Sequence, residues 1–313
     1  MPAAGKRRES DLIKEAEAVV IECSDGVALH GHIWSATSKR SNGNVVINPA
    51  TGVAARYYHY YARFLAEHGF DVLTYDYRGI GLSRPERLRD CGYRWRDWGE
   101  RDFDAALRFM EAQRPGRELF VVGHSIGGFL PGLSAHCDRV ARMLAVGAQY
   151  GNWRDYAPDH RGRLFAKWHL LMPAVTLLAG YFPGRRLGWL EDLPKGVALD
   201  WAFQRGWDSP RSAAKKDASK SFEDFHAPIL GLTVTDDEIG TVQAIRRGLS
   251  HYRSARVEEV LLAPDDLGFP RIGHFDLFHA RHAAGFWLDT LLWLRDGTNP
   301  WPHKKPPEHL VFA

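Results

Sequence analysis

The sequence predicts an α/β protein: a mostly parallel sheet of eight strands, with helices on both faces and a mainly helical insertion. Apolar segments of strand length alternate with segments of helical spacing over residues 45–148. The alternation resumes after about residue 226, and the stretch between is rich in aromatic residues, proline and glycine. Alternating strands and helices favour a parallel sheet that is covered on both sides.

The predicted elements follow one another in the order that such a sheet requires. A hairpin comes first, with strands at 19–22 and 27–34 and a turn at Asp25-Gly26. Six more strands are expected at 45–48, 70–75, 119–123, 143–148, 229–235 and 257–262. Helices are expected at 56–68, 98–113, 126–137, 241–252 and 279–295.

These elements divide the chain into a core and a cap. We expect residues 18–148 and 226–298 to form the core, residues 149–225 to form a helical cap or lid, and residues 1–17 and 299–313 to be terminal extensions. Within the cap, Leu170 to Phe182 is apolar on almost every face. Such a helix either closes an apolar pocket or simply packs on the core.

Composition excludes several classes of protein. The chain has 313 residues, with 41 basic and 38 acidic side chains, so its net charge of +3 gives no electrostatic case for nucleic acid. Three widely spaced cysteines favour neither a disulfide framework nor a metal site. No apolar stretch follows the basic N-terminus or reaches the length of a transmembrane segment, so we expect a cytoplasmic protein.

A nucleophile is predicted at Ser125, in the run Gly123-His124-Ser125-Ile126-Gly127 that follows an apolar strand. A very tight strand-to-helix turn strains the serine and lifts its hydroxyl clear of the sheet, which requires small residues at 123 and 127. The predicted helix that starts here directs free N–H groups at the hydroxyl. The N–H of Ile126 is therefore the expected first oxyanion donor.

A serine hydroxyl needs a histidine to take its proton, and the histidine needs an acid to orient it. In folds with this turn, the acid and then the histidine follow the nucleophile along the chain. His274 lies between the last predicted strand and the last predicted helix. Asp237 is the expected acid, because it stands two residues before Ile239 as in the Asp-x-Ile pattern of this loop, and Asp236 is the alternative.

The second oxyanion donor is expected after the strand at 45–48. Pro49 has no N–H to donate, so the donor is Ala50 or Thr51, and we favour Ala50.

Together with Tyr75-Asp76-Tyr77-Arg78-Gly79-Ile80-Gly81-Leu82-Ser83, these motifs resemble the α/β-hydrolase superfamily. The likeness is to its serine aminopeptidase and monoacylglycerol-lipase-like group. The resemblance covers roughly residues 18–148 and 226–295 and implies an α/β-hydrolase fold, no cofactor, and hydrolysis through an acyl-enzyme. Many relatives carry His-Gly where this chain has Asn48-Pro49.

The leading hypothesis is a hydrolase of carboxylic esters, acting on a small-molecule substrate with an apolar or aromatic acyl group. An acyltransferase or an amidase/aminopeptidase with the same triad is the first alternative, and Glu191 or Asp192 would then hold a substrate amine. A ligand-binding sensor on the same fold is the second alternative. Oligomeric state does not follow from the sequence.

Overall fold

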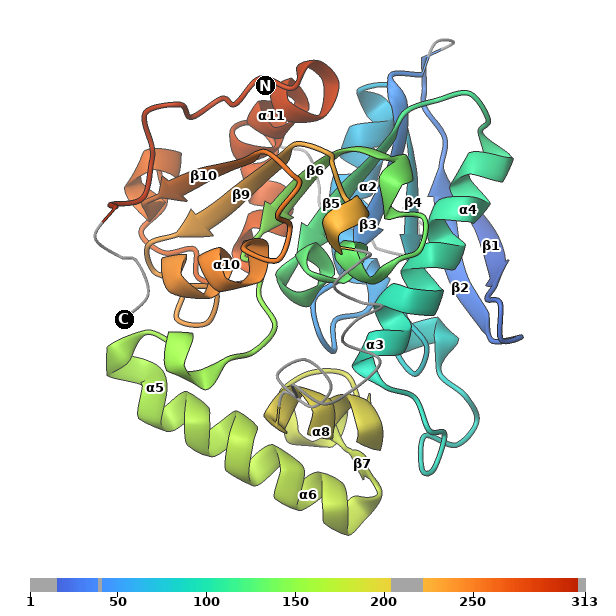
Figure 1. The fold of residues 1–313 in the computed structure, drawn as a ribbon, viewed down its shortest axis with the longest axis vertical. Helices are drawn as coiled ribbons and strands as arrows, with labels where there is room; N and C mark the ends of the chain where they lie inside the picture. The colour runs from blue at the N-terminus through green and yellow to red at the C-terminus, as the bar shows by residue number, and fades with distance from the viewer. Residues whose placement is uncertain (1–15, 39–40, 204–221, 309–313) are drawn as a thin grey trace, which may run out of the picture.

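The computed structural model describes residues 16–38, 41–203 and 222–308. An eight-stranded sheet lies at its centre, in the order β1-β2-β4-β3-β5-β6-β9-β10 (Figure 1). The strands are β1 (Glu17–Glu22), β2 (Ala28–Trp34), β3 (Gly43–Asn48), β4 (Phe70–Tyr75), β5 (Leu119–His124), β6 (Val140–Val146), β9 (Ile229–Val234) and β10 (Val257–Leu262). β2 is antiparallel to β1 and β4, and the other neighbouring pairs are parallel. The predicted mostly parallel eight-stranded sheet is confirmed.

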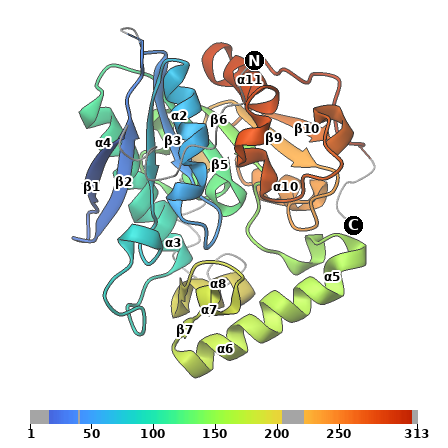
Figure 2. The ribbon, with the colours of Figure 1, turned by 180° about the vertical axis from the view of Figure 1, so that it is seen from behind.

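Helices cover both faces of this sheet, as Figures 1 and 2 show. On one face α2 (His59–Glu67) and α11 (Phe286–Leu291) bury side chains such as Tyr61 and Trp287. On the other face α4 (Asp104–Gln113) and α10 (Val242–Leu249) bury Met110 and Leu249. Because both faces are covered, β3, β4, β5 and β9 are buried along their whole length rather than at alternate residues.

Two predicted helices are shorter than expected. The segment 126–137 forms no continuous helix but short 3₁₀ turns at Ser125–Gly128, Leu130–Leu133 and Cys137–Arg139. Pro131 has no N–H to donate, and the glycines at 127, 128 and 132 favour helix poorly, so the continuous-helix prediction is wrong. The predicted helix at 279–295 begins only at Phe286, after Gly285, and ends in a π-helical turn at Leu292–Asp296.

Between β6 and β9 the chain leaves the sheet and forms the cap segment (149–225), described for residues 149–203 and 222–225. A long helical stretch consists of α5 (Pro158–Phe165), a π-helical turn (Ala166–Leu171) and α6 (Met172–Ala179). Then follow a two-stranded hairpin, β7 (Tyr181–Phe182) and β8 (Leu193–Pro194), with α7 (Gly184–Leu187) between its strands, and α8 (Lys195–Phe203). The prediction of a mainly helical insertion agrees with this arrangement, and the hairpin is an addition to it. None of the described helices is both long and apolar enough to cross a membrane.

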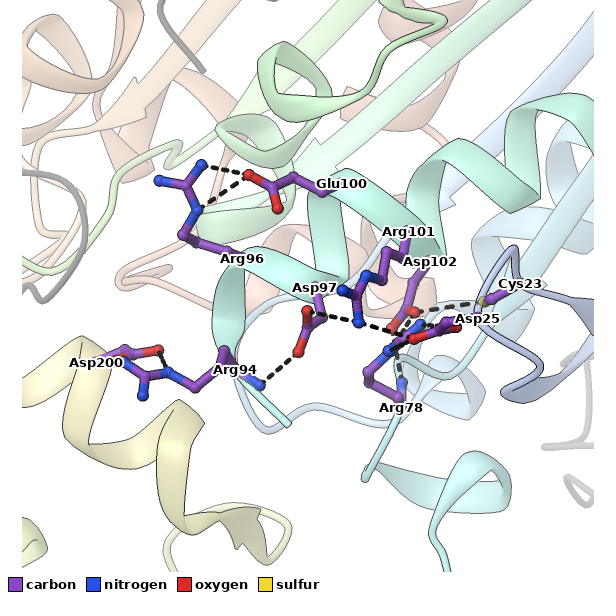
Figure 3. A network of polar contacts seen from close by, with 10 residues as sticks. All are labelled: Cys23, Asp25, Arg78, Arg94, Arg96, Asp97, Glu100, Arg101, Asp102 and Asp200. Carbon is purple, nitrogen blue, oxygen red and sulfur yellow. Dashed lines mark hydrogen bonds and ion pairs between the residues drawn. The ribbon is translucent and has the colours of Figure 1, made fainter. Parts of the chain in front are cut away.

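Ion pairs join the cap segment to the core. Arg94, which precedes the short helix α3 (Trp95–Asp97), donates from Nε to the buried carboxylate of Asp200 on α8 at 2.7 Å (Figure 3). Four further pairs make the same kind of connection: Arg56–Glu191, Arg84–Asp192, Arg163–Glu238 and Arg247–Asp155. Loss of the arginine should destabilise the protein most at Asp155 and Asp200, because both carboxylates are almost completely buried and depend on their arginines for charge compensation.

The glycine-rich loop after β4 is held by a buried charge network, also drawn in Figure 3. Arg78 donates to Asp102 at 2.6 Å and to Asp25 at 2.7 Å. Burial raises the pKa of Asp102 to about 6, although the charge and hydrogen bonds of Arg78 oppose that shift. This network connects β4, the hairpin turn and the helical segment before α4, so it supports the sheet edge that carries the candidate site.

Candidate active site

The predicted site residues gather at the carboxyl edge of the parallel strands. Ser125 follows β5, Asp237 follows β9, and Thr51 follows β3. His274 lies in the loop that follows β10. Parallel strands end at the same edge, so residues far apart in the sequence meet there, in the usual position for a site in this fold class.

Ser125 directly follows β5 and begins the 3₁₀ turn Ser125–Gly128 in a strained conformation. Its φ is +56°, a left-handed value that a residue with a side chain adopts only at an energetic cost. A Cβ at position 123 would lie 2.5 Å from the carbonyl oxygen of Gly127, and one at position 127 would lie 2.2 Å from that of Asn48. Both positions therefore require glycine, as the sequence analysis predicted.

Asp237 and His274 are in direct contact. The Asp237 Oδ2 lies 2.7 Å from His274 Nδ1, and both side chains are buried. Burial alone would raise the pKa of Asp237, but the charge and hydrogen bond of His274 and two backbone N–H groups outweigh it and lower the pKa. The N–H groups are those of Gly240, at 2.7 Å, and Ile239, at 2.9 Å. The carboxylate is therefore held ionised, which keeps the Nδ1–H tautomer of the imidazole.

Asp236, the alternative acid, has a different position. Its two carboxylate oxygens accept the N–H groups of Ile272 and Gly273, both at 2.9 Å. Asp236 thus holds the backbone of the loop that carries His274, and Asp237 contacts the ring. One of the two adjacent carboxylates therefore positions the backbone before His274, and the other binds its imidazole ring.

A chain of hydrogen bonds connects the loop after β3 with His274. The N–H of Ala50 donates to the Tyr58 hydroxyl at 2.9 Å, that hydroxyl lies 2.7 Å from His124 Nδ1, and His124 Nε2 lies 2.8 Å from the His274 carbonyl oxygen. A carbonyl only accepts, so His124 Nε2 donates and Nδ1 accepts from Tyr58. Complete burial lowers the pKa of His124 to about 3, and the charge of His274 adds to the effect, so the ring is neutral as this tautomer requires.

These hydrogen bonds bear on the choice between Ala50 and Thr51 as the second oxyanion donor. The N–H of Ala50, the favoured donor from the sequence, is already bonded to Tyr58, and Ala50 is buried. Thr51 is half-buried and borders the same pocket as Ile126. The geometry therefore favours Thr51 over Ala50, because the N–H of Ala50 is committed to the Tyr58 hydroxyl.

Gln149, at the start of the cap segment, contacts the candidate nucleophile and was not singled out from the sequence. Its Nε2 donates to Ser125 Oγ at 3.1 Å, and its Oε1 accepts the N–H of Gly151. The second bond fixes the orientation of the amide. Only the amide oxygen can accept the N–H of Gly151, so the NH₂ group faces Ser125. Glutamine is common in polar loops, so no sequence signal distinguished this one.

Ser125 and His274 themselves share no hydrogen bond in the described part of the chain, where the serine oxygen is bonded to Gln149. The rings of His124 and His274 have their centroids 5.1 Å apart, so the histidine lies beside the residue that precedes the serine. Hydrogen bonds of catalytic groups are often long without substrate and shorten when it binds.

A pocket borders the turn that carries Ser125. It lies between the core and the cap segment, and its walls are mainly aromatic and aliphatic. The lining residues are Thr51, Trp95, Trp98, Ile126, Gln149, Tyr150, Gly151, Val197, Asp200 and Trp201. Asp200 is ion-paired with Arg94, so the pocket offers chiefly apolar surface beside a few hydrogen-bonding groups.

Comparisons with known proteins agree with this fold. Residues 39–177 match the family described as Serine aminopeptidase, S33. No curated protein matches the chain in sequence.

Solved structures extend the likeness over nearly the whole chain. A soluble variant of monoglyceride lipase from Saccharomyces cerevisiae, in complex with a substrate analogue, has 17% identity and a TM-score of 0.64, covering 90% of this chain and 95% of that one. An esterase of Pyrococcus furiosus has 16% identity and a TM-score of 0.57, covering 94% and 95%. DcsB, in complex with its substrate analogue, has 13% identity and a TM-score of 0.60, covering 90% and 100%. The predicted α/β-hydrolase fold is confirmed.

Proposed function

We propose that this protein is a serine hydrolase that cleaves a carboxylic ester with an apolar or aromatic acyl group. The observation that carries the proposal is the pairing of the ionised Asp237 with His274 at the sheet edge where Ser125 occupies its strained turn. These are the three groups that nucleophilic acyl transfer needs, in the required chain order.

In the proposed reaction, His274 Nε2 takes the Ser125 hydroxyl proton as Oγ attacks the carbonyl carbon of the ester. The carbonyl π electrons move to its oxygen, and the N–H groups of Ile126 and Thr51 stabilise this oxyanion. The oxyanion collapses, the C–O bond to the alcohol breaks, and the alcohol leaves with the proton from His274. Water, deprotonated by His274, then releases the acid and restores Ser125.

Gln149 has a defined part in this proposal. Its Nε2–H donates to a lone pair of Ser125 Oγ, so the hydroxyl's own proton remains available for His274. The same donor stabilises the partial negative charge that Oγ carries as its proton departs. Gln149 thus acts on the nucleophile, whereas Ile126 and Thr51 act on the substrate carbonyl.

The pocket supports an apolar acyl group. Trp95, Trp98 and Trp201 supply aromatic surface, and Val197 supplies aliphatic surface, next to Ile126. Burial of apolar substrate surface there contributes roughly 25 cal/mol per Å². No unpaired carboxylate that would select a cationic substrate stands among these lining residues, since Asp200 is compensated by Arg94.

The aminopeptidase alternative finds no support in the two acids suggested for amine binding. Glu191 pairs with Arg56 at 2.6 Å, and Asp192 pairs with Arg84 at 2.5 Å. Neither residue lines the pocket at Ser125. Both are better explained as links between cap segment and core, so we favour an ester over a peptide as substrate.

A fluorophosphonate probe tests the proposal directly, because it reacts only with an activated serine. We expect the folded wild-type protein to be labelled at Ser125 and Ser125→Ala to remain unlabelled. Ser250→Ala, which removes an exposed serine, is the matched control and should label like the wild type. A folded wild-type protein that resists the probe would overturn the proposal and favour the ligand-binding alternative.

The bond class is tested with one acyl group presented as an ester and as an amide, each with and without an added alcohol. Faster release of free acid from the ester supports the proposal. Preferential cleavage of the amide, or transfer of the acyl group to the alcohol as the main outcome, would replace it with one of the alternatives.

A further inference from the structure

The outer face of the long cap helix carries exposed leucines. Leu170, Leu171, Leu177 and Leu178 are exposed on the π-helical turn and α6, and Leu178 is 88% exposed. The opposite side of the same helix is buried, with Met172 and Thr176 inside the cap. Leucines grouped in this way, rather than scattered singly, mark a surface that contacts another apolar phase. We call these four residues the leucine face.

The segment that carries the leucine face is basic in sequence, and of the arginines that follow it Arg185 also lies 3.6 Å from the carboxylate of Glu191. The sequence between Asp159 and Glu191 contains no acidic residue, whereas Lys167 precedes the face and Arg185 and Arg186 follow it. Both arginines are exposed. At the far end of α6, a side chain at Gly180 would contact Arg89, so a further exposed arginine lies there. The face is thus bordered by cations at both ends.

The leucine face lies one helix layer away from the pocket. α6 packs on α8, and α8 supplies Val197 and Trp201 to the pocket wall. In Figures 1 and 2 the α5–α6 stretch forms the outermost layer of the cap, on the side away from the sheet. Packed helices are about 10 Å apart, so a surface that touches α6 lies about one helix diameter from the helix that lines the pocket.

We infer that the leucine face docks onto an anionic lipid bilayer, with the cap helix lying in the plane of the interface. The leucines enter the boundary between headgroups and acyl chains, and Arg185, Arg186 and Arg89 bind the phosphates. A second copy of the chain is a poorer occupant. Either antiparallel or parallel pairing of two leucine faces brings a basic helix end against another basic end, which repels, whereas anionic headgroups neutralise both.

Vesicle flotation tests the inference with the full chain carrying Ser125→Ala, so that the result does not depend on turnover. We expect the protein to float with vesicles of phosphatidylcholine containing one-third phosphatidylglycerol. Binding to vesicles of phosphatidylcholine alone should be at least about tenfold weaker. Leu177→Glu/Leu178→Glu should lower the partition coefficient by about a hundredfold, because two apolar anchors are lost and two repelling charges are added.

The matched control is Leu288→Glu/Leu292→Glu. It changes two leucines that are also exposed but lie on α11 and the turn after it, at the end of the molecule opposite α6 (Figure 1). This control should bind like the parent protein. Circular dichroism and fluorophosphonate labelling of the same double variants with Ser125 intact confirm that both fold.

Two results would overturn the inference. One is a protein that binds neither vesicle composition, or that binds equally well with and without the leucines. The other is a dimer in sedimentation equilibrium that Leu177→Glu/Leu178→Glu dissociates without any change in vesicle binding, which would assign the leucine face to a second copy. Either result leaves the proposed hydrolase activity untouched, because the labelling of Ser125 measures that separately.

Discussion

The side-chain amide of Gln149 lies 3.1 Å from the hydroxyl oxygen of Ser125, with its NH₂ group turned to the serine by the bond from Gly151 N–H to its oxygen. This contact joins the first residues of the cap segment to the turn that carries the candidate nucleophile. The first prediction follows from its direction, since a donor at this position cannot be replaced by an acceptor.

We expect Gln149→Glu to lower kcat/KM by roughly a hundredfold, the usual effect of losing one preorganised donor at the reacting atoms. The carboxylate still accepts from Gly151 but would also accept the Ser125 proton and draw it away from His274. Gln149→Met, which removes the donor without adding an acceptor, should lose less. Gln113→Glu makes the same charge change at an exposed position and should have no effect. Equal activity of Gln149→Glu and the wild type, measured on one ester over a pH series, would contradict this role.

A pair of matched substitutions distinguishes the roles of Asp236 and Asp237. Asp237→Asn should lower kcat by about 10³–10⁴-fold, because the imidazole loses the partner that selects its tautomer and stabilises its charged form. Asp236→Asn keeps the ring contact and loses one of two backbone bonds, so kcat should fall only about tenfold. Steady-state kinetics with unchanged circular dichroism provide the measurement. A larger loss for Asp236→Asn would make Asp236 the acid.

Tyr58 and Tyr61 give a second matched pair at the start of α2. Both are completely buried and use their hydroxyl groups, Tyr58 towards His124 and Tyr61 towards Thr290. Each Tyr→Phe change should lower the free energy of unfolding by about 1–2 kcal/mol. Only Tyr58→Phe should also lower kcat, because it breaks the chain of bonds to the His274 carbonyl. Equal kcat values for the two variants would show that this chain is structural alone.

Arg94 is expected to hold the cap over the pocket. Arg94→Ala leaves the carboxylate of Asp200 buried without its arginine and should lower the free energy of unfolding by about 2 kcal/mol. It should also raise KM and open the cap segment to limited proteolysis. Arg139→Ala is the control, because Arg139 is about as exposed as Arg94 but pairs with the exposed Glu111. The idea fails if both variants show the same KM and the same cleavage pattern.

His59 should make stability depend on pH. Both of its ring nitrogens are buried without a hydrogen-bond partner among the described residues. Burial lowers its pKa to about 3, and the nearby His32 and Arg56 act in the same direction. In the unfolded chain this histidine binds a proton near pH 6.5, whereas in the folded chain it stays neutral down to about pH 3. The free energy of unfolding therefore decreases as the pH falls from 6.5 towards 3.

One such histidine should lower the free energy of unfolding by about 2 kcal/mol between pH 7.5 and pH 5. Urea unfolding at a series of pH values measures this, and His59→Phe should reduce the loss by that amount. The exposed His303 is the control, and His303→Gln should leave the slope unchanged. An identical slope for His59→Phe and the wild type would contradict the assignment.

Much of the fold could be predicted because its signals are local. Apolar strands, helical spacing and glycines at turns are properties of short segments, and all eight strands of the sheet were placed within a few residues. The segment 126–137 is the exception. Small residues suggested a helix there, but Pro131 lacks an N–H and the glycines favour helix poorly, so short 3₁₀ turns form instead.

Contacts between distant segments were beyond prediction from local patterns. The sequence offered Asp236 beside Asp237 and Ala50 beside Thr51, and local spacing gives no physical reason to separate such neighbours. Their surroundings in the fold distinguish them. The N–H of Ala50 donates to the Tyr58 hydroxyl, and the carboxylate of Asp236 accepts the backbone N–H groups of residues 272 and 273. Gln149 has no local signal at all, and only the approach of the cap segment to β5 brings it to the serine.

The sequence by itself determined the class of fold, the order of the strands along the chain, the strained turn at Ser125, and the histidine and acidic loop that follow it. These depend on backbone freedom and hydrophobic spacing, which each segment carries alone. Tertiary structure decided which carboxylate touches His274, which hydroxyl binds the N–H of Ala50, what surrounds the pocket, and which leucines remain exposed. Those outcomes depend on distances between segments that lie up to 218 residues apart in the chain, and only the folded sheet and its cap determine such distances.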